Sequence, residues 1–308
     1  MRLVAPPFPP EAWMRARTLR SRPADVDRVR ELLGEHRVSI VIPARNEAAT
    51  VGAVVAAALA GLPDSAGEVV VVDDASLDGT ADAARAGGAR VVRSPQPLGK
   101  GGALRRGVAE SSGDLVVFLD ADVPDFEAHW VASMLLPLLT WPQVMLVKAA
   151  YDRPLEVDGV VHPASGGRVT RLVAVPALNL MAPELTVIAQ PLAGESAVRR
   201  TLLDQVVLAD GYAIELSLLL DTYEAGGLGA LAQVDLGERA HRHHSDDALA
   251  RMATSVLRVV ARHAGWQVTR SGFAAPRRGA DGAWERRVEP LAPAWADPDD
   301  VVDPASRI

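Results

Sequence analysis

The feature that most constrains the fold is a regular alternation of short apolar runs and helix-forming segments in the first half of the chain. Residues 38–42, 68–72, 90–93 and 116–119 are rich in β-branched side chains, and segments of helical length separate them. Buried strands of a parallel sheet have this composition because both of their faces are covered. The alternation therefore predicts repeated β-α-β units that form a parallel sheet with helices on both faces.

The same patterns place the remaining elements. We expect helices at residues 10–19, 23–33, 48–60, 79–87, 103–111, 125–139, 168–180 (with a break at Pro176), 214–224 and 246–263, and further strands at 144–150 and 228–235. Residues 155–167 are expected to form a loop and 190–195 a turn. The chain then divides into a helical lead-in (1–37), two halves (38–150 and 151–264) and a tail (265–308) that partly wraps the body or is mobile.

Composition narrows the class of protein. The chain is 49% hydrophobic and 23% charged, as soluble globular proteins are. A net charge of -7 and only 4% aromatic residues argue against a nucleic-acid partner. The chain contains no cysteine, which excludes disulfides, thiolate zinc sites and cysteine nucleophiles. Because neither a signal peptide nor a 20-residue apolar span is present, we expect a cytoplasmic protein with no membrane partner.

Polar residues follow the predicted strands. Right-handed crossovers bring segments 43–47, 73–78, 97–101 and 120–122 to one edge of the sheet, where open α/β sheets bind their ligands. Asp120 and Asp122 end the fourth strand. Their hard oxygen ligands suit Mg²⁺ or Mn²⁺ bridging to a substrate's phosphates. The alternative is an ordinary acidic turn after a strand.

A glycine-rich segment at residues 98–103 carries Lys100 just before a predicted helix. Glycines let backbone N–H groups approach an anion, and the helix N-terminus adds a favourable dipole. The spacing matches neither the Walker A loop nor the G-x-G-x-x-G dinucleotide fingerprint. The segment thus predicts a phosphate contact, with a solvated lysine on a glycine-rich turn as the alternative.

Two further segments carry residues suited to ligand binding. His241 and His243 would share one face if their segment were extended, and neutral imidazole is a good ligand for Mn²⁺ or Zn²⁺. An exposed loop is the preferred interpretation for His244. Residues 166–170 resemble an anion nest in which Arg168 grips a phosphate or carboxylate. Glu215 precedes an apolar helical run and is expected to be partly buried and to point inward, as a site residue or as a helix N-terminal glutamate.

Together these segments resemble nucleotide-sugar glycosyltransferases of the GT-A fold. PARNEA, DDAS-LDGT, GKGGALRRG and FLDAD occur in the order that this superfamily uses. The motifs LVKAAYDRP, GGRVTRLVA, PLAGE, GYAIELSLLLDTY and AQVDLGERAHRH narrow the resemblance to the glucosyl- and mannosyl-3-phosphoglycerate synthases, from about residue 38 to 263. The resemblance implies a Rossmann-like, mostly parallel sheet, with residues 38–150 binding the nucleotide-sugar and 151–264 the acceptor.

The resemblance also implies a role for each matching position. The nucleoside and donor residues would be Pro43, Ala44, Asn46, Glu47, Asp73, Lys100, Asp120 and Ala121. The sugar-site residues would be Leu192, Ala193, Gly194, Tyr212 and Glu215. The phosphoglycerate pocket would comprise Gly167, Arg168, Val169, Thr170, Arg239 and His243. The divalent metal, Mg²⁺ or Mn²⁺, would be held by Asp122 and His241. The catalytic group would be Asp120, Asp122, Glu215 and Lys100.

The activity implied is transfer of a hexose from UDP-glucose, GDP-glucose or GDP-mannose to 3-phosphoglycerate with retention of configuration, by a homodimer. The products would be precursors of compatible solutes of the glucosylglycerate or mannosylglycerate type, or of polysaccharides. A front-face route, in which the leaving phosphate assists deprotonation of the acceptor, is our hypothesis. Arg45 and Asp74 stand where some glucosyl relatives have leucine and serine, and His243 replaces an asparagine. Base recognition and phosphate binding therefore stay open.

Three other functions remain possible on this sequence. A sugar-phosphate nucleotidylyltransferase would share the sheet and the metal, but it should carry a G-x-G-T-R loop after the first strand. A GT-A transferase with a different small acceptor is the second alternative. A pseudo-enzyme or scaffold is the third, and the joint presence of Asp122, His241, Lys100 and Arg168 argues against it.

Overall fold

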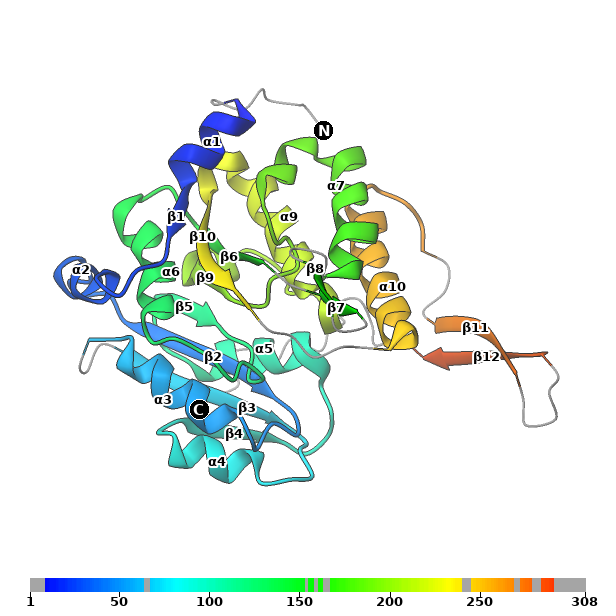
Figure 1. Cartoon of the computed structure of the whole chain (residues 1–308), viewed down its shortest axis with the longest axis horizontal. Helices are drawn as coiled ribbons and strands as arrows, with labels where there is room; N and C mark the ends of the chain where they lie inside the picture. Colours follow the sequence, from blue (N-terminus) through cyan, green and yellow to red (C-terminus); the bar gives the residue numbers. More distant parts are fainter. Residues whose placement is uncertain are drawn as a thin grey trace, which may run out of the picture.

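The computed structural model describes residues 9–63, 67–152, 155–157, 160–162, 167–239, 245–268, 272–278 and 284–290. Its centre is an eight-stranded sheet in the order β1-β10-β6-β9-β5-β2-β3-β4 (Figure 1). The strands are β1 Thr18–Arg20, β2 Val38–Ala44, β3 Gly67–Asp74, β4 Arg90–Ser94, β5 Leu115–Phe118, β6 Leu146–Asp152, β9 Ser196–Arg199 and β10 Leu231–Glu238. Strand β9 is antiparallel to β5 and β6, and the other neighbouring pairs are parallel. The predicted α/β fold with a mostly parallel sheet is confirmed.

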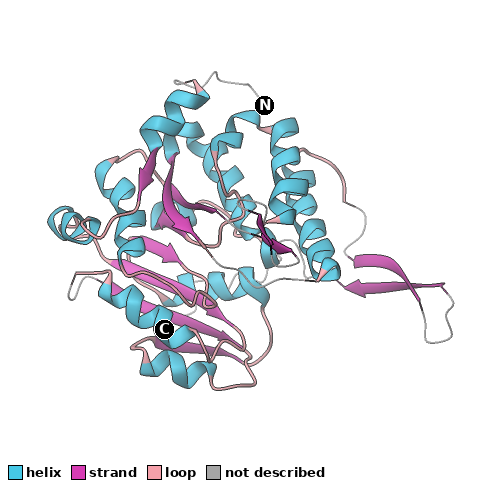
Figure 2. Cartoon of the chain, in the orientation of Figure 1, coloured by secondary structure: helices cyan, strands magenta, loops and turns pink. Residues whose placement is uncertain are grey.

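Helices cover both faces of this sheet, as expected (Figure 2). The helices are α1 Pro10–Arg17, α2 Asp25–Leu32, α3 Val51–Ala60, α4 Thr80–Ala86, α5 Gly99–Glu110, α6 His129–Thr140, α7 Val175–Met181, α8 Arg200–Leu203, α9 Ile214–Gly226 and α10 Asp246–His263. Short turns of 3-10 helix lie at η2 Pro183–Val187, η3 Gly211–Ala213 and η4 Gly227–Ala230, and a π-helical turn at η1 Thr170–Ala174.

Alternate residues of the central strands belong to two separate cores. Ile40 and Ile42 of β2 pack with α2, α3, α4 and α6, whereas Val41 between them packs with α1, α5, α7, α9 and α10. Both faces are therefore buried, which explains why the strands read as continuous apolar runs without polar alternation. Each buried aliphatic side chain of this kind contributes roughly 1.5–3 kcal/mol to the free energy of unfolding.

Several boundaries differ from the sequence-based expectation. The helix expected to reach Leu19 ends at Arg17, because Thr18–Arg20 pairs with β10 at the edge of the sheet. Strand β9 was not predicted at all. The expected loop 155–167 contains two short antiparallel strands, β7 Leu155–Val157 and β8 Val160–His162. The break expected at Pro176 is a π-helical turn that leads directly into α7, since the amide of Val175 bonds to the carbonyl of Thr170.

The described part of the tail forms a second small sheet. β11 Gly272–Arg278 and β12 Trp284–Pro290 pair antiparallel and extend away from the body beside α10 (Figure 1). An ion pair of 2.8 Å between Arg251 of α10 and Glu289 connects the two parts. The hairpin was not predicted, and in its described residues the tail projects from the body and does not wrap it.

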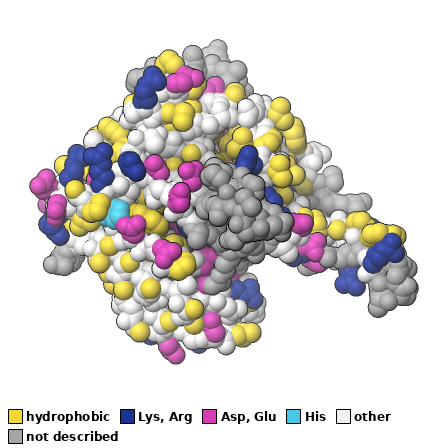
Figure 3. Space-filling model, in the orientation of Figure 1, with side chains coloured by type: hydrophobic (Ala, Val, Ile, Leu, Met, Phe, Trp, Pro, Cys, Tyr) yellow, Lys and Arg dark blue, Asp and Glu magenta, His cyan; other side chains and the backbone are white. Residues whose placement is uncertain are grey.

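The surface and the helices give two general findings. The face drawn in Figure 3 mixes acidic, basic, apolar and uncharged side chains. Among the residues that the structure describes, no helix combines the length and the apolar character that crossing a membrane requires.

Candidate active site

The segments that follow β2 and β3 are joined by hydrogen bonds at the carboxyl edge of the sheet. Asn46 adopts a left-handed conformation with φ 57°, and its side-chain oxygen accepts a bond of 2.9 Å from the amide of Leu77. Its own amide donates to Ser76 Oγ at 3.0 Å, and the amide of Glu47 donates to the buried Thr80 hydroxyl at 2.8 Å. Asparagine is among the residues that tolerate this backbone conformation best. The predicted nucleoside residues Asn46 and Glu47 therefore lie on a fixed loop.

The remaining predicted nucleoside residues are the last residues of two neighbouring strands. Pro43 and Ala44 end β2, where they pair with Val72 and Asp73 of β3. Asp73 is completely buried, accepts a bond of 3.0 Å from the amide of Ser76 and forms an ion pair of 2.9 Å with Arg93. The structure thus brings these three predicted residues to one edge; what they bind stays a prediction.

Asp74, expected from the sequence only to bear on base recognition, holds the glycine-rich segment in place. The Asp74 carboxylate accepts bonds from the amides of Leu98 (2.6 Å) and Gly99 (3.0 Å) at the start of α5. α5 begins at Gly99, four residues earlier than predicted, so Lys100 lies in its first turn. Because both carboxylate oxygens of Asp74 accept hydrogen bonds from these amides, Asp74 orients α5. The two amides therefore already have a hydrogen-bond acceptor within the protein.

Gly101 explains why this segment is rich in glycine. A Cβ at this position would lie 2.2 Å from the carbonyl oxygen of Ala209 and 2.8 Å from Cα of Asp210. Helix α5 therefore approaches the backbone ahead of η3 and α9 as closely as only glycine permits. The close approach brings Lys100 beside Glu215, the second residue of α9. The glycine serves helix packing here, in addition to any role toward a phosphate.

Lys100 bridges two carboxylates that come from opposite halves of the chain. Its Nζ lies 2.7 Å from Asp120 Oδ1 and 2.7 Å from Glu215 Oε1. Burial alone lowers the pKa of Lys100, but the two carboxylates outweigh burial and raise the pKa well above its ordinary value. Lys100 therefore stays positively charged, and three of the four predicted catalytic residues form one ionic group.

A second cation lies beside the paired carboxylates at the end of β5. Arg239 is 5% exposed; its guanidinium forms an ion pair with buried Glu195 and approaches Asp120 at 3.7 Å and Asp122 at 3.9 Å. Burial lowers the pKa of Arg239, and Glu195, with lesser contributions from nearby groups, more than compensates and raises it. Tyr151 donates a bond of 3.2 Å to Glu195. Arg239, predicted to bind the acceptor, therefore lies among the carboxylates of Asp120, Asp122 and Glu195.

The predicted sugar-binding segment packs directly on Asp120. A Cβ on Gly194 would lie 2.4 and 2.5 Å from the two carboxylate oxygens of Asp120. The preceding residue, Ala193, is fully buried, and its carbonyl accepts a bond of 2.6 Å from Lys148. Leu192 is half-buried beside it. The segment 192–194 is therefore held against the acidic end of β5, together with the buried Ala121.

Tyr212 lies at the rim of the same group. It belongs to η3, directly before α9, and about half of it is exposed. Burial raises the pKa of its hydroxyl, and the nearby carboxylates add to the rise while Lys100 opposes it. The structure therefore brings the predicted donor-sugar residues together around the ionic group of Lys100, Asp120 and Glu215.

The other predicted acceptor residues lie at the start of the η1 turn. Gly167 has a left-handed φ of 74°, its carbonyl accepts from the amide of Arg171, and Thr170 is buried. Arg168 forms an ion pair of 2.5 Å with Asp246 in the first turn of α10. The predicted residues Gly167–Thr170 thus form a turn joined to α10, whereas Arg239 lies among the carboxylates.

The predicted metal site is described only in part. His241 and His243, with their neighbour His244, lie outside the described residues. The Asp122 side chain is 38% exposed and lies 3.9 Å from Arg239, beyond hydrogen-bonding distance, and its role as a metal ligand stays a prediction. A carboxylate oxygen of this kind is the ligand type that Mg²⁺ and Mn²⁺ prefer. The residues present are compatible with a divalent ion at the end of β5.

Two further residues of the site were not predicted from the sequence. Lys148 is 1% exposed in the middle of β6, and burial lowers its pKa to about 8, against the opposing charge of Glu215. Glu195 is likewise 1% exposed. A charged residue inside an apolar strand is rarely buried unless it is paired, so Lys148 within the predicted strand 144–150 was the available signal.

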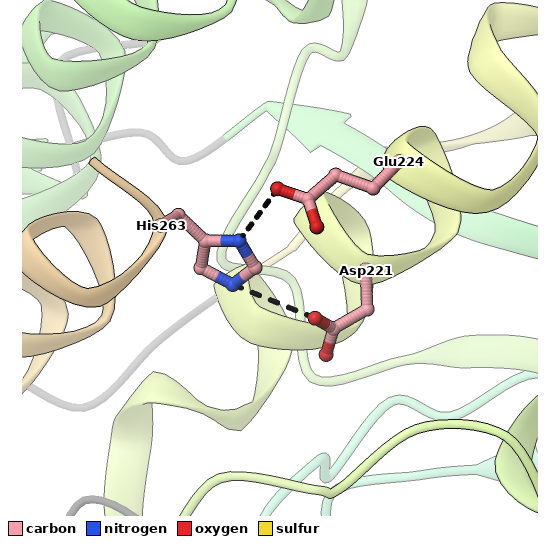
Figure 4. A group of neighbouring side chains, drawn as sticks. All are labelled: Asp221, Glu224 and His263. Atoms are coloured by element: carbon pink, nitrogen blue, oxygen red, sulfur yellow. Dashed lines mark hydrogen bonds and ion pairs between the residues drawn. The ribbon is translucent and has the colours of Figure 1, made fainter. Parts of the chain in front are cut away.

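A separate group of metal-type ligands connects α9 and α10 (Figure 4). Asp221, Glu224 and His263 place one ligand atom each within 4.8 Å of the others. His263 Nδ1 lies 3.0 Å from Glu224 and its Nε2 lies 3.5 Å from Asp221, so the carboxylates face different edges of the ring. Because one ion can bind only one ring nitrogen, the arrangement better suits a ring that interacts with a carboxylate at each nitrogen than a metal site.

Comparison with known proteins decides the family. A family model described as "Glycosyl transferase family 2" matches residues 39–157. Glucosyl-3-phosphoglycerate synthase of Mycolicibacterium smegmatis is 44% identical over 256 residues, which covers 80% of this chain and 82% of that protein. The chain belongs to the glucosyl- and mannosyl-3-phosphoglycerate synthase family. The same enzyme of Mycobacterium tuberculosis is 44% identical over 230 residues, with 71% of each protein covered.

Solved structures agree with this assignment to the family. Mannosyl-3-phosphoglycerate synthase from Rubrobacter xylanophilus superposes with a TM-score of 0.81 at 35% identity, covering 95% of this chain and 100% of that one. Glucosyl-3-phosphoglycerate synthase from Mycobacterium tuberculosis, in complex with Mn²⁺, UDP and glucosyl-3-phosphoglycerate, gives 0.79 at 36% identity, covering 90% and 95%. Another structure of that enzyme holds Mg²⁺ and UDP. The recognition of the family and the GT-A fold are confirmed.

Proposed function

We propose that this chain transfers a hexose from a nucleotide-sugar to 3-phosphoglycerate with retention of configuration. Glucose is the favoured sugar, because two relatives that are 44% identical to this chain are glucosyl-3-phosphoglycerate synthases. UDP-glucose, GDP-glucose and GDP-mannose are the donors to compare. The observation that carries the proposal is the Lys100 bridge, which joins the Asp120 end of β5 to the Glu215 end of α9 at 2.7 Å each. A hexose bound there would lie between the two halves of the chain.

In this proposal the protein's own residues bind and orient the donor. Asn46 and Glu47 contribute a fixed loop for the nucleoside, and Gly194 leaves room for the Asp120 carboxylate beside the sugar. Lys100 pairs with both Asp120 and Glu215 and balances their charge. A carboxylate held in such a pair is a weak nucleophile, which favours the front-face route over double displacement. Detection of a covalent glycosyl-enzyme by mass spectrometry would contradict this route.

Asp122 and His241 are the residues proposed to hold a divalent ion. When bound, the ion would neutralise negative charge on the departing diphosphate. Arg239 lies 3.9 Å from Asp122 and adds positive charge on the side of Glu195. The acceptor, which carries a phosphate and a carboxylate, is proposed to bind Arg168 and residues 167–170 together with Arg239 and His243, so that the second half supplies positive charge without a generally basic surface.

The hydrogen bonds of Asp74 reduce the number of residues that could recognise the base of the nucleotide. Its two oxygens bond to the amides of Leu98 and Gly99, which assigns this aspartate to the start of α5 and not to reading the base. Arg45, exposed in the loop after β2, is then the remaining departure that could distinguish uracil from guanine. Replacing Arg45 with leucine and comparing the KM for UDP-glucose with that for GDP-glucose tests this assignment.

The decisive experiment measures product formation by the purified chain from UDP-glucose, GDP-glucose and GDP-mannose, each with and without 3-phosphoglycerate. The expected result is acceptor-dependent release of the nucleoside diphosphate that requires Mg²⁺ or Mn²⁺ and is lost in chelator. Asp122→Ala should abolish this turnover. Full activity in strong chelator, or unchanged turnover of Asp122→Ala, would contradict the metal role. Release of a sugar 1-phosphate and a nucleoside triphosphate when pyrophosphate is supplied in place of 3-phosphoglycerate would instead indicate nucleotidyl transfer.

The biological setting is proposed on the same basis. We propose that the product is a precursor of compatible solutes or polysaccharides, that the protein acts in the cytoplasm and that it forms a homodimer. Sedimentation equilibrium of the full chain measures the oligomeric state, and a mass of 32.6 kDa across the concentration range would exclude the dimer.

A further inference from the structure

Lys148 lies directly beneath the proposed sugar site and is assigned no part in it by the family resemblance. It belongs to the middle of β6, paired with Gln233 of β10 and Ser196 of β9, and only 1% of it is exposed. An ammonium group is almost never buried to this extent without a specific partner. The burial of Lys148 therefore indicates that its ammonium group has a specific bonding partner within the protein.

Lys148 donates a hydrogen bond to a backbone carbonyl of the proposed sugar-binding segment, residues 192–194. Lys148 Nζ donates to the oxygen of Ala193 at 2.6 Å. The next residue, Gly194, is the one whose missing side chain accommodates the Asp120 carboxylate. The amide of Ala149 also bonds to the carbonyl of Glu195 at 3.1 Å. Two consecutive residues of β6 thus fix the turn that contacts Asp120.

The charges around Lys148 come from each of the elements that meet at this site. Glu215 of α9 has the strongest electrostatic influence on it, followed by Lys100 of α5, Glu195 ahead of β9, and Asp120 after β5. The three carboxylates favour the ammonium form, and Lys100 opposes it. The carboxylates of Asp120 and Glu215 already share Lys100. The positive charge of Lys148 further reduces the repulsion between them.

We infer that Lys148 is a positioning residue for the donor sugar: by bonding to the carbonyl of Ala193, it sets the Ala193–Gly194 peptide against Asp120. The inference rests on the proposed function and deepens it. Lys148 acts through the peptide and touches no reacting atom. Its loss should therefore affect recognition of the sugar, and leave binding of the nucleoside diphosphate, which uses the loops after β2 and β3, unchanged.

The test compares K148M, an unbranched apolar replacement of similar length, with R199M. Arg199 also donates to backbone carbonyls, of Val144 (2.9 Å) and Leu138 (2.5 Å), but it ends β9 at the edge of the sheet opposite the site. Affinities for UDP and for UDP-glucose are measured by calorimetry with Mg²⁺. K148M should weaken UDP-glucose about tenfold and change UDP less than twofold, whereas R199M should keep the ratio of the two affinities. Equal loss of both ligands, or no loss, would overturn the inference.

Hydrogen–deuterium exchange provides a readout that needs no ligand. The amides of residues 190–195 should exchange faster in K148M than in the wild type, and not in R199M. If no sugar nucleotide is turned over by the wild type, the proposed function fails, while this exchange still decides whether Lys148 holds the segment. Unchanged exchange in K148M would refute the role of Lys148. Should K148M not fold, K148Q, which keeps a polar group at this position, serves for both measurements.

Discussion

Gly194→Ala is the substitution whose effect can be worked out most directly. The φ of Gly194 is outside the left-handed region, so alanine fits the backbone and only the added methyl group matters. That methyl would lie 2.4 Å from an Asp120 oxygen, where ordinary contacts begin at 3.4 Å. Asp120 or the segment 192–194 must therefore move by about 1 Å, which lengthens the bond of 2.7 Å between Asp120 and Lys100.

Overpacking of this kind costs about 1–3 kcal/mol, and a displacement of about 1 Å at a reacting group costs on the order of a hundredfold in rate. We expect kcat/KM for the sugar nucleotide to fall about 10- to 100-fold, with the affinity for the nucleoside diphosphate alone nearly unchanged. Steady-state kinetics and calorimetry measure the two quantities. Gly229→Ala is the matched control, because a Cβ there has no neighbour within 4 Å among the described residues and φ is permissive. Activity of Gly194→Ala within twofold of the wild type would refute the reasoning.

Three further predictions concern residues that support the site. Asp74→Asn replaces one acceptor of the amides of Leu98 and Gly99 with a donor, so thermal unfolding should show a loss of about 1–3 kcal/mol, together with weaker donor binding; unchanged stability would show that these bonds contribute little. Burial lowers the pKa of Lys148 to about 8, against about 10.5 in the unfolded chain, so the folded protein releases this proton first. The free energy of unfolding of the wild type relative to K148M should therefore rise with pH between 8 and 10.5, by about 3 kcal/mol in total, as measured by urea unfolding; a flat difference would contradict the lowered pKa. Burial raises the pKa of Asp221, and the charge of His263 opposes this rise, so His263→Gln should raise the pKa of Asp221 further, as measured by NMR titration of its side-chain carboxyl group; an unchanged pKa of Asp221 would exclude His263 as the opposing charge.

The sequence was sufficient for the elements whose strands are buried on both faces. Residues 38–42 and 68–72 were recognised because their apolar runs are uninterrupted, and the structure places them side by side as β2 and β3. The same logic missed β9, since Ser196–Arg199 spans four residues and its pairing partners lie far away along the chain. Thr18–Arg20 was misassigned to a helix because only its pairing with the distant β10 makes it a strand. Local patterns carry no information on such long-range pairing.

The candidate site shows the same difference between what local sequence predicts and what depends on contacts between distant segments. Asp120, Lys100 and Glu215 were each proposed as site residues from their local sequence, but nothing local indicates that one ammonium group bridges both carboxylates. Similarly, Gly101 suggested an anion-binding loop, whereas its close approach to Ala209 becomes visible only when α5 and the residues ahead of η3 are packed together. The contribution of Asp74 depends on a bond across 24 residues of sequence. Roles that depend on packing between distant segments require coordinates.

The reversed direction of β9 has a consequence for engineering the enzyme. In a parallel sheet, variation of a binding pocket is confined to the residues that follow each strand. Because β9 runs the opposite way between β5 and β6, the residues that precede it arrive at the pocket, and those after it face the remote edge. Insertions or swaps ahead of Ser196 should therefore remodel the proposed hexose pocket, while changes after Arg199 should act at the far end of the sheet.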